Sequence, residues 1–510
     1  MEISSNRTIL KNTILLYFRL ALVTVVGLYA SRVILQTLGV DDFGIYNVAG
    51  SAVALFTFLS GALGQSSSRY ITVEIGKVKN DDISDLLRCF KTTRTIHGIL
   101  AIIIGIVCET LGLWILHKSS IPADRQMAAF WVFQISTVTA MINVTQIPFN
   151  ALIIAHERMG VFAVASIFES LAKLGVCFLL IFSPIDKLVY YAVLLFVVQL
   201  AVFVFYRIYC TKSFAECQLG YRLDKDFFKP ILSFSFWSLF GGLAYSALTQ
   251  GTTILVSFFF SPAIVAARSI ANQVKGHVTV FVTNFRTAIN PQIIKRHAAG
   301  EVESSKELLF LSTNITFYLM LVFVLPLVFE SRFVLKLWLA DVPEYTVEFT
   351  QIALLEMLFY VYDVTFFQIF QATGRLKENA LICPLVDFVG LVVVYIMYIM
   401  GAGVLVIAWC MVILTMLEGM LIKPFLAVKL FGYSWKEFFV VFVNNIKVCI
   451  CATVLPLAIY LLFEKTVLNN CIVIMISVIS VLLSSFFIGL NNSERIKVKE
   501  IIITKIRNKK

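Results

Sequence analysis

Long apolar runs separated by short charged segments constrain this chain more than any other feature. A helix needs about 20 apolar residues to cross the hydrocarbon of a bilayer, and about fourteen such runs occur. They lie at roughly 12–38, 44–74, 90–116, 127–154, 160–183, 187–210, 230–259, 263–288, 307–329, 347–372, 378–400, 403–427, 437–463 and 470–490. The sequence therefore predicts an all-α, multi-pass membrane protein with about fourteen transmembrane helices.

The composition excludes most soluble classes of protein. Hydrophobic residues make up 59% and charged residues 14% of the 510 residues, whereas soluble proteins carry about 25% charged residues. The net charge of +11 does not indicate a nucleic-acid binder, because the basic residues lie between and beside the apolar runs. The ten cysteines form no CxxC pair, and the five histidines form no evident constellation with a nucleophile. We therefore predict no metal site, no catalytic residue and no bound cofactor.

The basic residues between the runs predict the orientation of the chain. With the N-terminus inside, the inner segments hold about 28 cations, Lys423 among them. The outer segments hold only six cations: Lys118, Arg125, Lys187, Arg332, Lys336 and Lys465. This bias predicts that both termini are cytoplasmic. Residues 491–510 are predicted to form a basic cytoplasmic tail.

An internal similarity predicts how the helices are grouped. ETLGLWILHKSSIP, from Glu109, lines up with ESRFVLKLWLADVP, from Glu330, at an offset of about 220 residues. Six predicted helices separate the two segments, so both repeats have the same orientation. We predict two pseudo-symmetric six-helix lobes around a central cavity, over 1–215 and 216–432, followed by two extra helices over 433–490.

Ionisable side chains within the runs are candidate functional residues, because a charge at the bilayer centre costs about 2.5–3.5 kcal/mol. Arg268, Asn272, Lys275 and Arg286 lie on one face of the helix predicted over 263–288. This helix contains no acid that would neutralise Lys275, which favours a cavity that binds a phosphate or pyrophosphate. The alternative is that these cations pair with acids of other helices.

Four acids lie within the later runs: Glu356, Asp363, Asp387 and Glu418. Acids at this depth are typical of a proton or sodium relay, so they indicate coupling to H⁺ or Na⁺. Their alternative role is to neutralise Lys275 and Arg268. Glu169 and Lys173 are spaced i, i+4 on an earlier helix, and we interpret them as a structural pair.

Three segments carry a resemblance to a known family. They are SRVILQTLGVDDFGIYNV from Ser31, SRYITVEIGK from Ser68 and QATGRLKENA from Gln371. The chain resembles bacterial polysaccharide and O-antigen flippases, in the superfamily that also holds multidrug and toxin extrusion (MATE) transporters and the lipid II flippase. The paired lobes and the two extra C-terminal helices agree with this family over nearly the whole chain.

The resemblance implies a transporter, not an enzyme, in the cytoplasmic (inner) membrane. It would move undecaprenyl-pyrophosphate-linked oligosaccharide from the inner to the outer leaflet by alternating access, for polysaccharide biosynthesis. A polysaccharide polymerase is an implied partner. Such flippases use cavity cations on helices 1, 2 and 8, where this chain has Arg19, Arg32, Arg69, Arg268, Lys275 and Arg286.

Two alternatives stay open at this point. One is a MATE-type antiporter that couples cation entry to the efflux of small molecules. That branch typically places an acid on helix 1, which has none here, and a cavity lined by Arg and Lys disfavours cationic drugs. The other alternative is a membrane enzyme such as a polysaccharide polymerase.

Overall fold

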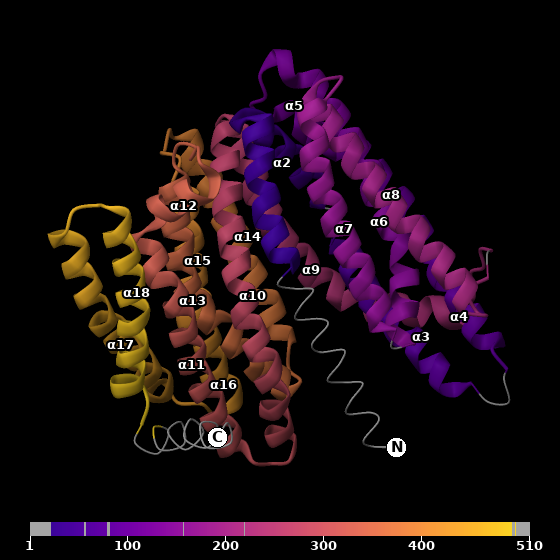
Figure 1. Ribbon diagram of the computed structural model, residues 1–510. Helices are drawn as coiled ribbons and strands as arrows, with labels where there is room; N and C mark the ends of the chain where they lie inside the picture. The colour runs from indigo at the N-terminus through magenta and orange to yellow at the C-terminus, as the bar shows by residue number, and fades with distance from the viewer. Residues whose placement is uncertain are drawn as a thin grey trace, which may run out of the picture. The chain divides into compact units, whose positions relative to one another are not determined.

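The computed structural model describes residues 22–55, 58–78, 82–156, 158–218, 220–491 and 495. Helices account for all the regular secondary structure of these residues (Figure 1). The chain packs as two compact units. Unit 1 comprises the described residues through Ser269 together with Trp338–Glu344. Unit 2 comprises Ile270–Leu337 and the described residues from Tyr345 onward.

Unit 1 is built around the long helix α6, which packs against α8, α4 and α3. Helix α9 packs on α3 and α2, so it belongs to the same unit. The elements are Leu22–Leu38, α2 (Val40–Ala54), α3 (Phe58–Lys77), α4 (Ser84–Val107), the π-helix η1 (Cys108–Gly112), α5 (Leu113–Lys118), η2 (Ala123–Arg125), α6 (Gln126–Ala155), α7 (Met159–Leu179), η3 (Leu180–Phe182), α8 (Lys187–Ser213), α9 (Lys225–Phe259) and the first residues of α10 (Pro262–Ala298).

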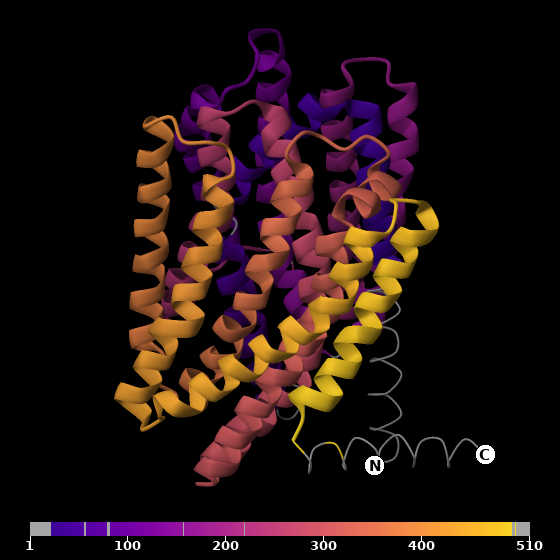
Figure 2. The same ribbon diagram turned by 90° about the vertical axis from the view of Figure 1, so that its left-hand side faces the viewer.

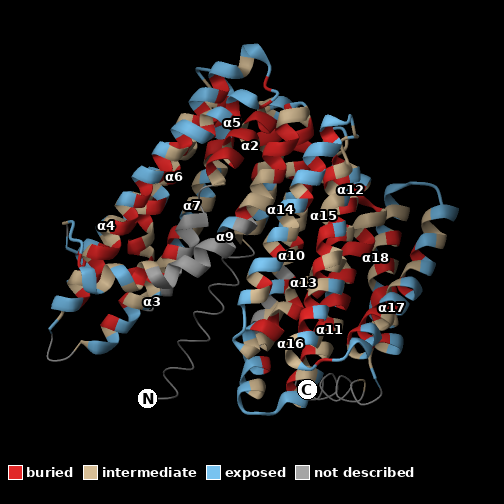
Figure 3. Cartoon of the chain, turned by 180° about the vertical axis from the view of Figure 1, so that it is seen from behind, coloured by how far each residue is buried: buried red, intermediate tan, exposed pale blue. Residues whose placement is uncertain are grey.

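Unit 2 continues α10 and is centred on α11 and α13. In the most apolar stretch of each of these two spans, 56% of the residues are buried, against 17% in the spans of α14 and α18. Figure 3 shows the same contrast. Its other elements are α11 (Val302–Phe329), α12 (Ser331–Leu339), α13 (Thr346–Thr373), α14 (Lys377–Ile399), α15 (Val406–Leu417), the π-helix η4 (Glu418–Ile422), α16 (Lys423–Phe431), α17 (Trp435–Leu462), α18 (Val467–Ser484) and η5 (Ser485–Gly489). The last two residues of α12 fall in unit 1.

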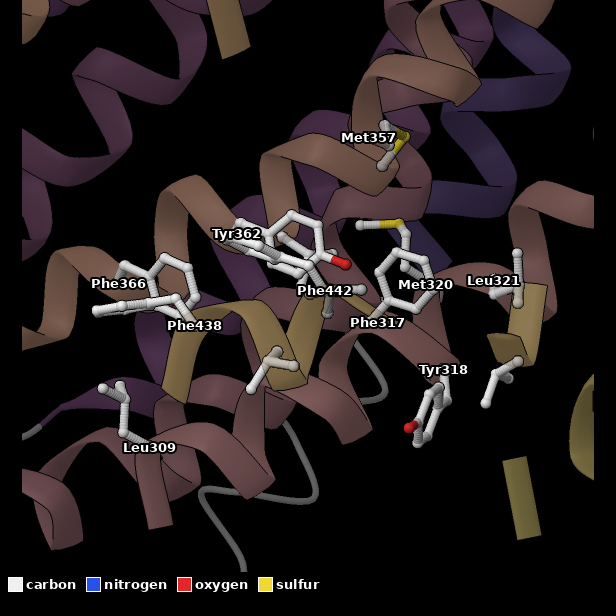
Figure 4. Packing of buried hydrophobic residues seen from close by; sticks show 14 of the residues in the cluster. Leu309, Phe317, Tyr318, Met320, Leu321, Met357, Tyr362, Phe366, Phe438 and Phe442 are labelled. Carbon is white, nitrogen blue, oxygen red and sulfur yellow. The ribbon is translucent and has the colours of Figure 1, made fainter. Parts of the chain in front are cut away.

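An aromatic cluster ties α17 to the centre of unit 2 (Figure 4). Tyr362 of α13 stacks with Phe317 of α11 at 5.7 Å and meets the edge of Phe442 of α17 at 4.9 Å. Asn445 of α17 also donates to the Tyr362 hydroxyl. Helices α17 and α18 lie side by side (Figure 2), and both pack as part of unit 2.

Glycines set two of the close turns and contacts in unit 1. Gly39 has φ 85°, which L side chains rarely adopt. It lies where the helix Leu22–Leu38 meets α2 at a bend of 118°. Gly44 lets α2 approach the start of α10, since a Cβ there would lie 1.9 Å from the carbonyl oxygen of Pro262. The run expected over 44–74 corresponds to two helices, α2 and α3.

Fewer helices qualify as membrane spans than the sequence predicts. Among the described residues, ten helices are long and apolar enough to cross a membrane, or eleven if the bent pair is one span. Helices α3, α9 and α10 are not among them. At 35 and 37 residues, α9 and α10 exceed the length required. Helix α10 does not qualify because it is too polar, since it carries the cationic residues identified from the sequence.

The two units divide the chain differently from the predicted lobes. The boundary between the units lies within α10, between Ser269 and Ile270, whereas the first predicted lobe ends at residue 215. Helix α9, expected to begin the second lobe, packs with unit 1. The predicted basic tail over 491–510 lies almost entirely outside the described residues. The six-helix lobes stay a prediction.

Candidate functional site

The cationic residues predicted on one helical face lie on α10, where they have different partners. Arg268 belongs to unit 1 and is 7% exposed. Its guanidinium donates to the backbone oxygen of Thr252 at 3.0 Å and to the Thr252 hydroxyl at 2.6 Å. Asn272, Lys275 and Arg286 belong to unit 2. Asn272 is exposed, whereas Lys275 and Arg286 contact α13.

Lys275 forms an ion pair with Glu356 of α13. The Nζ–Oε1 distance is 2.5 Å, and the Thr415 hydroxyl of α15 donates to the same carboxylate oxygen at 3.3 Å. Glu356 is 6% exposed, whereas the Lys275 side chain is 26% exposed. Lys275 thus has a carboxylate partner on another helix, as the alternative interpretation of this residue required. Its side chain nevertheless remains partly accessible beside that partner.

Arg286 contacts α13 further along the same helix. Its Nη2 donates to the backbone oxygen of Val364, and its Nε is buried without a hydrogen-bond partner among the described residues. Lys275 contacts position 356 and Arg286 contacts position 364, so α10 and α13 run in the same direction here. The two contacts lie about 12 Å apart along α13, at 1.5 Å per residue.

A second group of charges lies in the interior of unit 2, around Lys423 of α16. Its Nζ donates to the carboxylate of Asp363 and, at 3.0 Å, to the backbone oxygen of the same residue. Lys423 is only 4% exposed, and its ammonium also lies 5.6 Å from the centre of the Phe367 ring. An ammonium group removed from water this completely requires a carboxylate partner.

Glu418 and Asp387 complete this group, which we call the carboxyl cluster together with Asp363 and Lys423. The Glu418 carboxyl interacts with both Asp363 and Asp387, and its Oε1 is buried without a hydrogen-bond partner among the described residues. Gly419 permits this approach, since a Cβ there would lie 2.8 Å from the Asp363 amide nitrogen. Among the described residues Lys423 forms its ion pair with Asp363 alone, so the carboxyl groups of Glu418 and Asp387 lie near this pair without a cation of their own and are candidates for proton binding.

The backbone around Glu418 departs from a regular α-helix. Glu418 begins the five-residue π-helix η4, which joins α15 to α16 within the candidate span Val406–Phe431. Such insertions in α-helices occur frequently at functional sites. The four acids identified from the sequence thus lie in two places. Glu356 accompanies Lys275, Asp363 pairs with Lys423, and Glu418 and Asp387 lie near that second pair.

Lys423 is a candidate functional residue that the sequence pattern does not predict. The positive-inside count assigned it to an inner connecting segment, but it lies within a candidate span and is buried against Asp363. One signal was present in the sequence, because Lys423 interrupts the apolar stretch GMLIKPFLAV only five residues after Glu418. The π-helix that brings the two side chains to the same group cannot be read from that spacing.

Of the three other predicted cations, two lie among the described residues of unit 1. Arg32 lies half-buried in the helix Leu22–Leu38. Arg69 is exposed on α3, with its guanidinium carbon 5.9 Å from the centre of the Tyr70 ring. Arg19 lies outside the described residues. Their role in binding an anion therefore stays a prediction.

Cross-helix ion pairs in unit 1 lie at helix ends. Arg125 binds Asp42 at 2.5 Å and Asp186 at 2.6 Å, and Asp186 also caps the N-terminus of α8. Arg88 of α4 binds Asp224, the N-cap residue of α9, at 2.7 Å. The hydrogen bond from Arg88 lowers the pKa of the Asp224 carboxyl. These contacts fix where helices begin.

Within the part of the chain that the structure describes, the charged groups best suited to bind a substrate or protons therefore lie in unit 2. A partly accessible ammonium with an exchangeable carboxylate partner can bind an anion. Three carboxyl groups around one buried ammonium can bind and release protons. The pair and the cluster share α13, which supplies both Glu356 and Asp363.

Comparison with known protein families identifies the chain. Residues 9–297, more than half of its length, match the profile described as polysaccharide biosynthesis protein. The chain belongs to the polysaccharide biosynthesis protein family. This is a family of membrane transporters and not of enzymes, which excludes the polymerase alternative. Residues 238–396 also match the MatE family profile. No curated protein sequence matches the chain significantly.

Solved structures show that this family member has a MATE-like fold. A multidrug resistance MATE family transporter of the MOP superfamily, in an inward-facing conformation, matches with TM-score 0.70 at 14% identity, covering 80% of this chain and 94% of that one. The lipid II flippase MurJ, in an inward closed conformation, matches with TM-score 0.64 at 15% identity, covering 93% and 98%. The MATE multidrug transporter DinF-BH matches with TM-score 0.59 at 14% identity, covering 85% and 96%.

Proposed function

We propose that this polysaccharide biosynthesis transporter flips undecaprenyl-pyrophosphate-linked oligosaccharide from the inner to the outer leaflet of the cytoplasmic membrane. The observation that carries the proposal is the partly accessible ammonium of Lys275, held by Glu356 within a chain of this family. A pyrophosphate that leaves water needs cationic partners, and an ammonium supplies three donors to its oxygens. The similarity in fold to the lipid II flippase supports a lipid-linked substrate.

In this proposal Lys275 exchanges one anionic partner for another. Without substrate, Glu356 neutralises the ammonium, so that the charge of Lys275 does not lie unpaired in the membrane interior. When the pyrophosphate arrives, its oxygens compete for Lys275, and Arg268, Asn272 and Arg286 extend the same face of α10. Glu356 stays beside Lys275 after the exchange and favours release of the substrate by charge repulsion.

We further propose that the carboxyl cluster couples transport to an ion. Both H⁺ and Na⁺ agree with buried acids, but the ammonium of Lys423 already occupies the position of a cation beside Asp363. We therefore favour protons, which bind one carboxyl group at a time. Because Asp363 and Glu356 both belong to α13, a change at the cluster can reach the Lys275 pair through that helix.

The proposal includes the finer architecture expected from the sequence. We propose that α9 and α10 also cross the membrane, and that about fourteen helices form two lobes with two additional C-terminal helices. Helices that line a wet cavity need not be uniformly apolar, which is consistent with the polarity of α10. Both termini would be cytoplasmic, and rocking of the lobes would give alternating access, alone or beside a polysaccharide polymerase.

The test is charge reversal at the proposed site. Lys275→Glu and Arg268→Glu are expected to abolish surface glycan in a deletion strain complemented with each variant, while protein level and membrane insertion stay normal. Lys118→Glu, which alters an exposed cation outside the site, serves as the matched control and should export normally. Normal export by both site variants would remove the assignment.

Efflux of small cations remains the second candidate function. The MatE match over 238–396 and the similarity to DinF-BH support it only at the level of the fold. It would require an acid that is available to a cationic drug. Glu356 and Asp363 are instead occupied by lysines. Drug resistance conferred by the chain, with surface glycan unaffected by its deletion, would favour efflux.

A further inference from the structure

A cavity with both apolar and charged walls lies at one end of unit 2, distant in the chain from the α10 face. Its volume is about 830 Å³, within the range of about 300–1,000 Å³ typical of ligand sites. It is enclosed by the end of α11, by α12, by the start of α13, and by the connection between α17 and α18. All of these elements meet at the end of unit 2 that the charge pattern predicts to face outward.

Three cations line this cavity, which we call the α12 cavity. They are Arg332 and Lys336 of α12 and Lys465 from the connection between α17 and α18. Two acids, Glu330 and Glu348, also line it. Burial raises the pKa of the Glu330 carboxyl, although Lys465 opposes this effect. Three cations thus face two acids around this cavity.

These residues are unusual for the side of the membrane on which they are predicted to lie. Only six cations were expected in outer segments, and half of them line this one cavity. In unit 1 another outer cation, Arg125, is neutralised by two aspartates. In the part of the chain that the structure describes, Arg332 and Lys336 form no ion pair. Because the cations outnumber the acids around this cavity, the arrangement favours an anionic ligand.

The wall beside Lys465 is suited to the interface of a membrane. Its ammonium donates to the Tyr460 hydroxyl at 3.0 Å and lies 4.7 Å from the centre of the Tyr460 ring. The Tyr460 ring in turn lies 5.5 Å from the Phe329 ring. Aromatic rings with a polar edge and long cationic side chains concentrate at the level of lipid headgroups. The aromatic part can contact glycerol or sugar, and the cations can contact phosphate.

We propose that the α12 cavity binds the anionic, phosphate-bearing headgroup of a lipid at the membrane interface. Arg332, Lys336 and Lys465 would contact the phosphate, and Tyr460 would lie against the part of the headgroup that joins it to the chains. Two sources have this chemistry, an anionic phospholipid and an isoprenyl-phosphate lipid. The site lies wholly within unit 2 and does not depend on the proposed exchange at Lys275.

The test measures binding of short-chain lipid probes to the purified full-length protein in detergent by isothermal titration calorimetry. The probes are dioctanoyl phosphatidylglycerol, farnesyl phosphate, dioctanoyl phosphatidylcholine and inorganic phosphate. The site variant combines Arg332→Gln, Lys336→Gln and Lys465→Gln. Its control removes three exposed cations elsewhere through Lys118→Gln, Lys377→Gln and Lys436→Gln. Each variant is also made with Lys275→Met and Glu356→Met, which separates this cavity from the proposed transport site.

We expect phosphatidylglycerol, farnesyl phosphate or both to bind at least about tenfold more weakly to the site variant than to its control. The same difference is expected in the Lys275→Met and Glu356→Met background. The probe that shows the difference identifies the source of the lipid. The proposal is overturned if neither lipid shows it, if phosphatidylcholine binds equally well, or if only inorganic phosphate binds.

Discussion

The two units place their cross-helix ion pairs at different positions along their helices. In unit 1, Arg125 and Arg88 bind aspartates at the ends of helices, where those aspartates also act as caps or begin helices. In unit 2, Lys275 pairs with Glu356 and Lys423 pairs with Asp363 well inside α10, α13 and the span Val406–Phe431. Both units pair a cation with a carboxylate, but at different positions along their helices.

This difference shows which charges carry function. Pairs at helix ends remain near water and headgroups, where an ion pair contributes modestly and chiefly organises connections. Each ion in a low-dielectric interior costs several kcal/mol of desolvation, and an apolar pair of similar volume is often as stable. Charges in the interior of unit 2 are therefore not explained by stability alone. We expect removal of the Lys275–Glu356 pair to affect transport, whereas removal of a pair in unit 1 should affect stability only.

The largest expected effect is on export. Lys275→Met combined with Glu356→Met removes the interior pair and leaves an apolar contact, so folding should be largely retained. Surface glycan in a complemented deletion strain should fall at least about tenfold, with the protein level measured by immunoblot. The surface pair Glu169 and Lys173, 2.6 Å apart on α7, provides the control through Glu169→Met and Lys173→Met. Equal export by both double variants would eliminate the distinction between the units.

The second effect is on stability within unit 2. Lys423→Met leaves three carboxyl groups without their ammonium, and breaking a buried pair in this way typically costs about 3–5 kcal/mol. Thermal unfolding of the purified protein should therefore begin at a clearly lower temperature. Addition of Asp363→Asn should recover much of the loss, because one charge disappears with its partner. A double variant as unstable as Lys423→Met would show that Asp363 is not the partner that matters.

A smaller effect is expected at Asp224 of unit 1, and it depends on pH. Because Arg88 lowers the pKa of the Asp224 carboxyl in the folded protein, this contact stabilises the fold above the ordinary pKa of about 3.9. The stabilisation is lost as the pH falls through the lowered value. Asp224→Asn keeps a good N-cap residue but removes the charge that Arg88 binds. It should therefore lower the melting temperature by a few degrees at pH 7. That difference should shrink as the pH falls below about 4, and a difference independent of pH would contradict the assignment.

The smallest effect is expected at the pair on α7. An exposed i, i+4 pair contributes about 0.3–0.5 kcal/mol, so Lys173→Gln should change the melting temperature of the protein very little. A loss of stability as large as that of Lys423→Met would place this pair against lipid, where an unpaired Glu169 is costly. Unit 1 would then also contain interior charges.

The sequence predicts the fold class well and the site only in part. Apolar length alone indicates a helical membrane protein, and the resemblance indicates the family, which the match over residues 9–297 confirms. The periodicity of α10 places Lys275 and Arg286 on one face, and both do contact α13. The ion pair predicted between Glu169 and Lys173 is also confirmed. These features depend on spacing within one helix, which a sequence contains.

Other features depend on how helices meet, which spacing does not encode. The pairing of Lys275 with Glu356 joins residues 81 positions apart, and only packing selects it from the four candidate acids. The carboxyl cluster requires the π-helix at Glu418 and the absence of a side chain at Gly419. Lys423 was assigned to a connecting segment because a lysine beside an apolar run usually marks its end.

The affinity of the purified protein for farnesyl pyrophosphate tests the exchange at Lys275 most directly. Glu356→Gln removes the competing carboxylate but keeps the ammonium, so it should bind this probe several-fold more tightly than the unaltered protein does. Lys275→Met with Glu356→Met should bind it at least about tenfold more weakly. Unchanged affinity in both variants would contradict the account, because Lys275 would then hold Glu356 and nothing else.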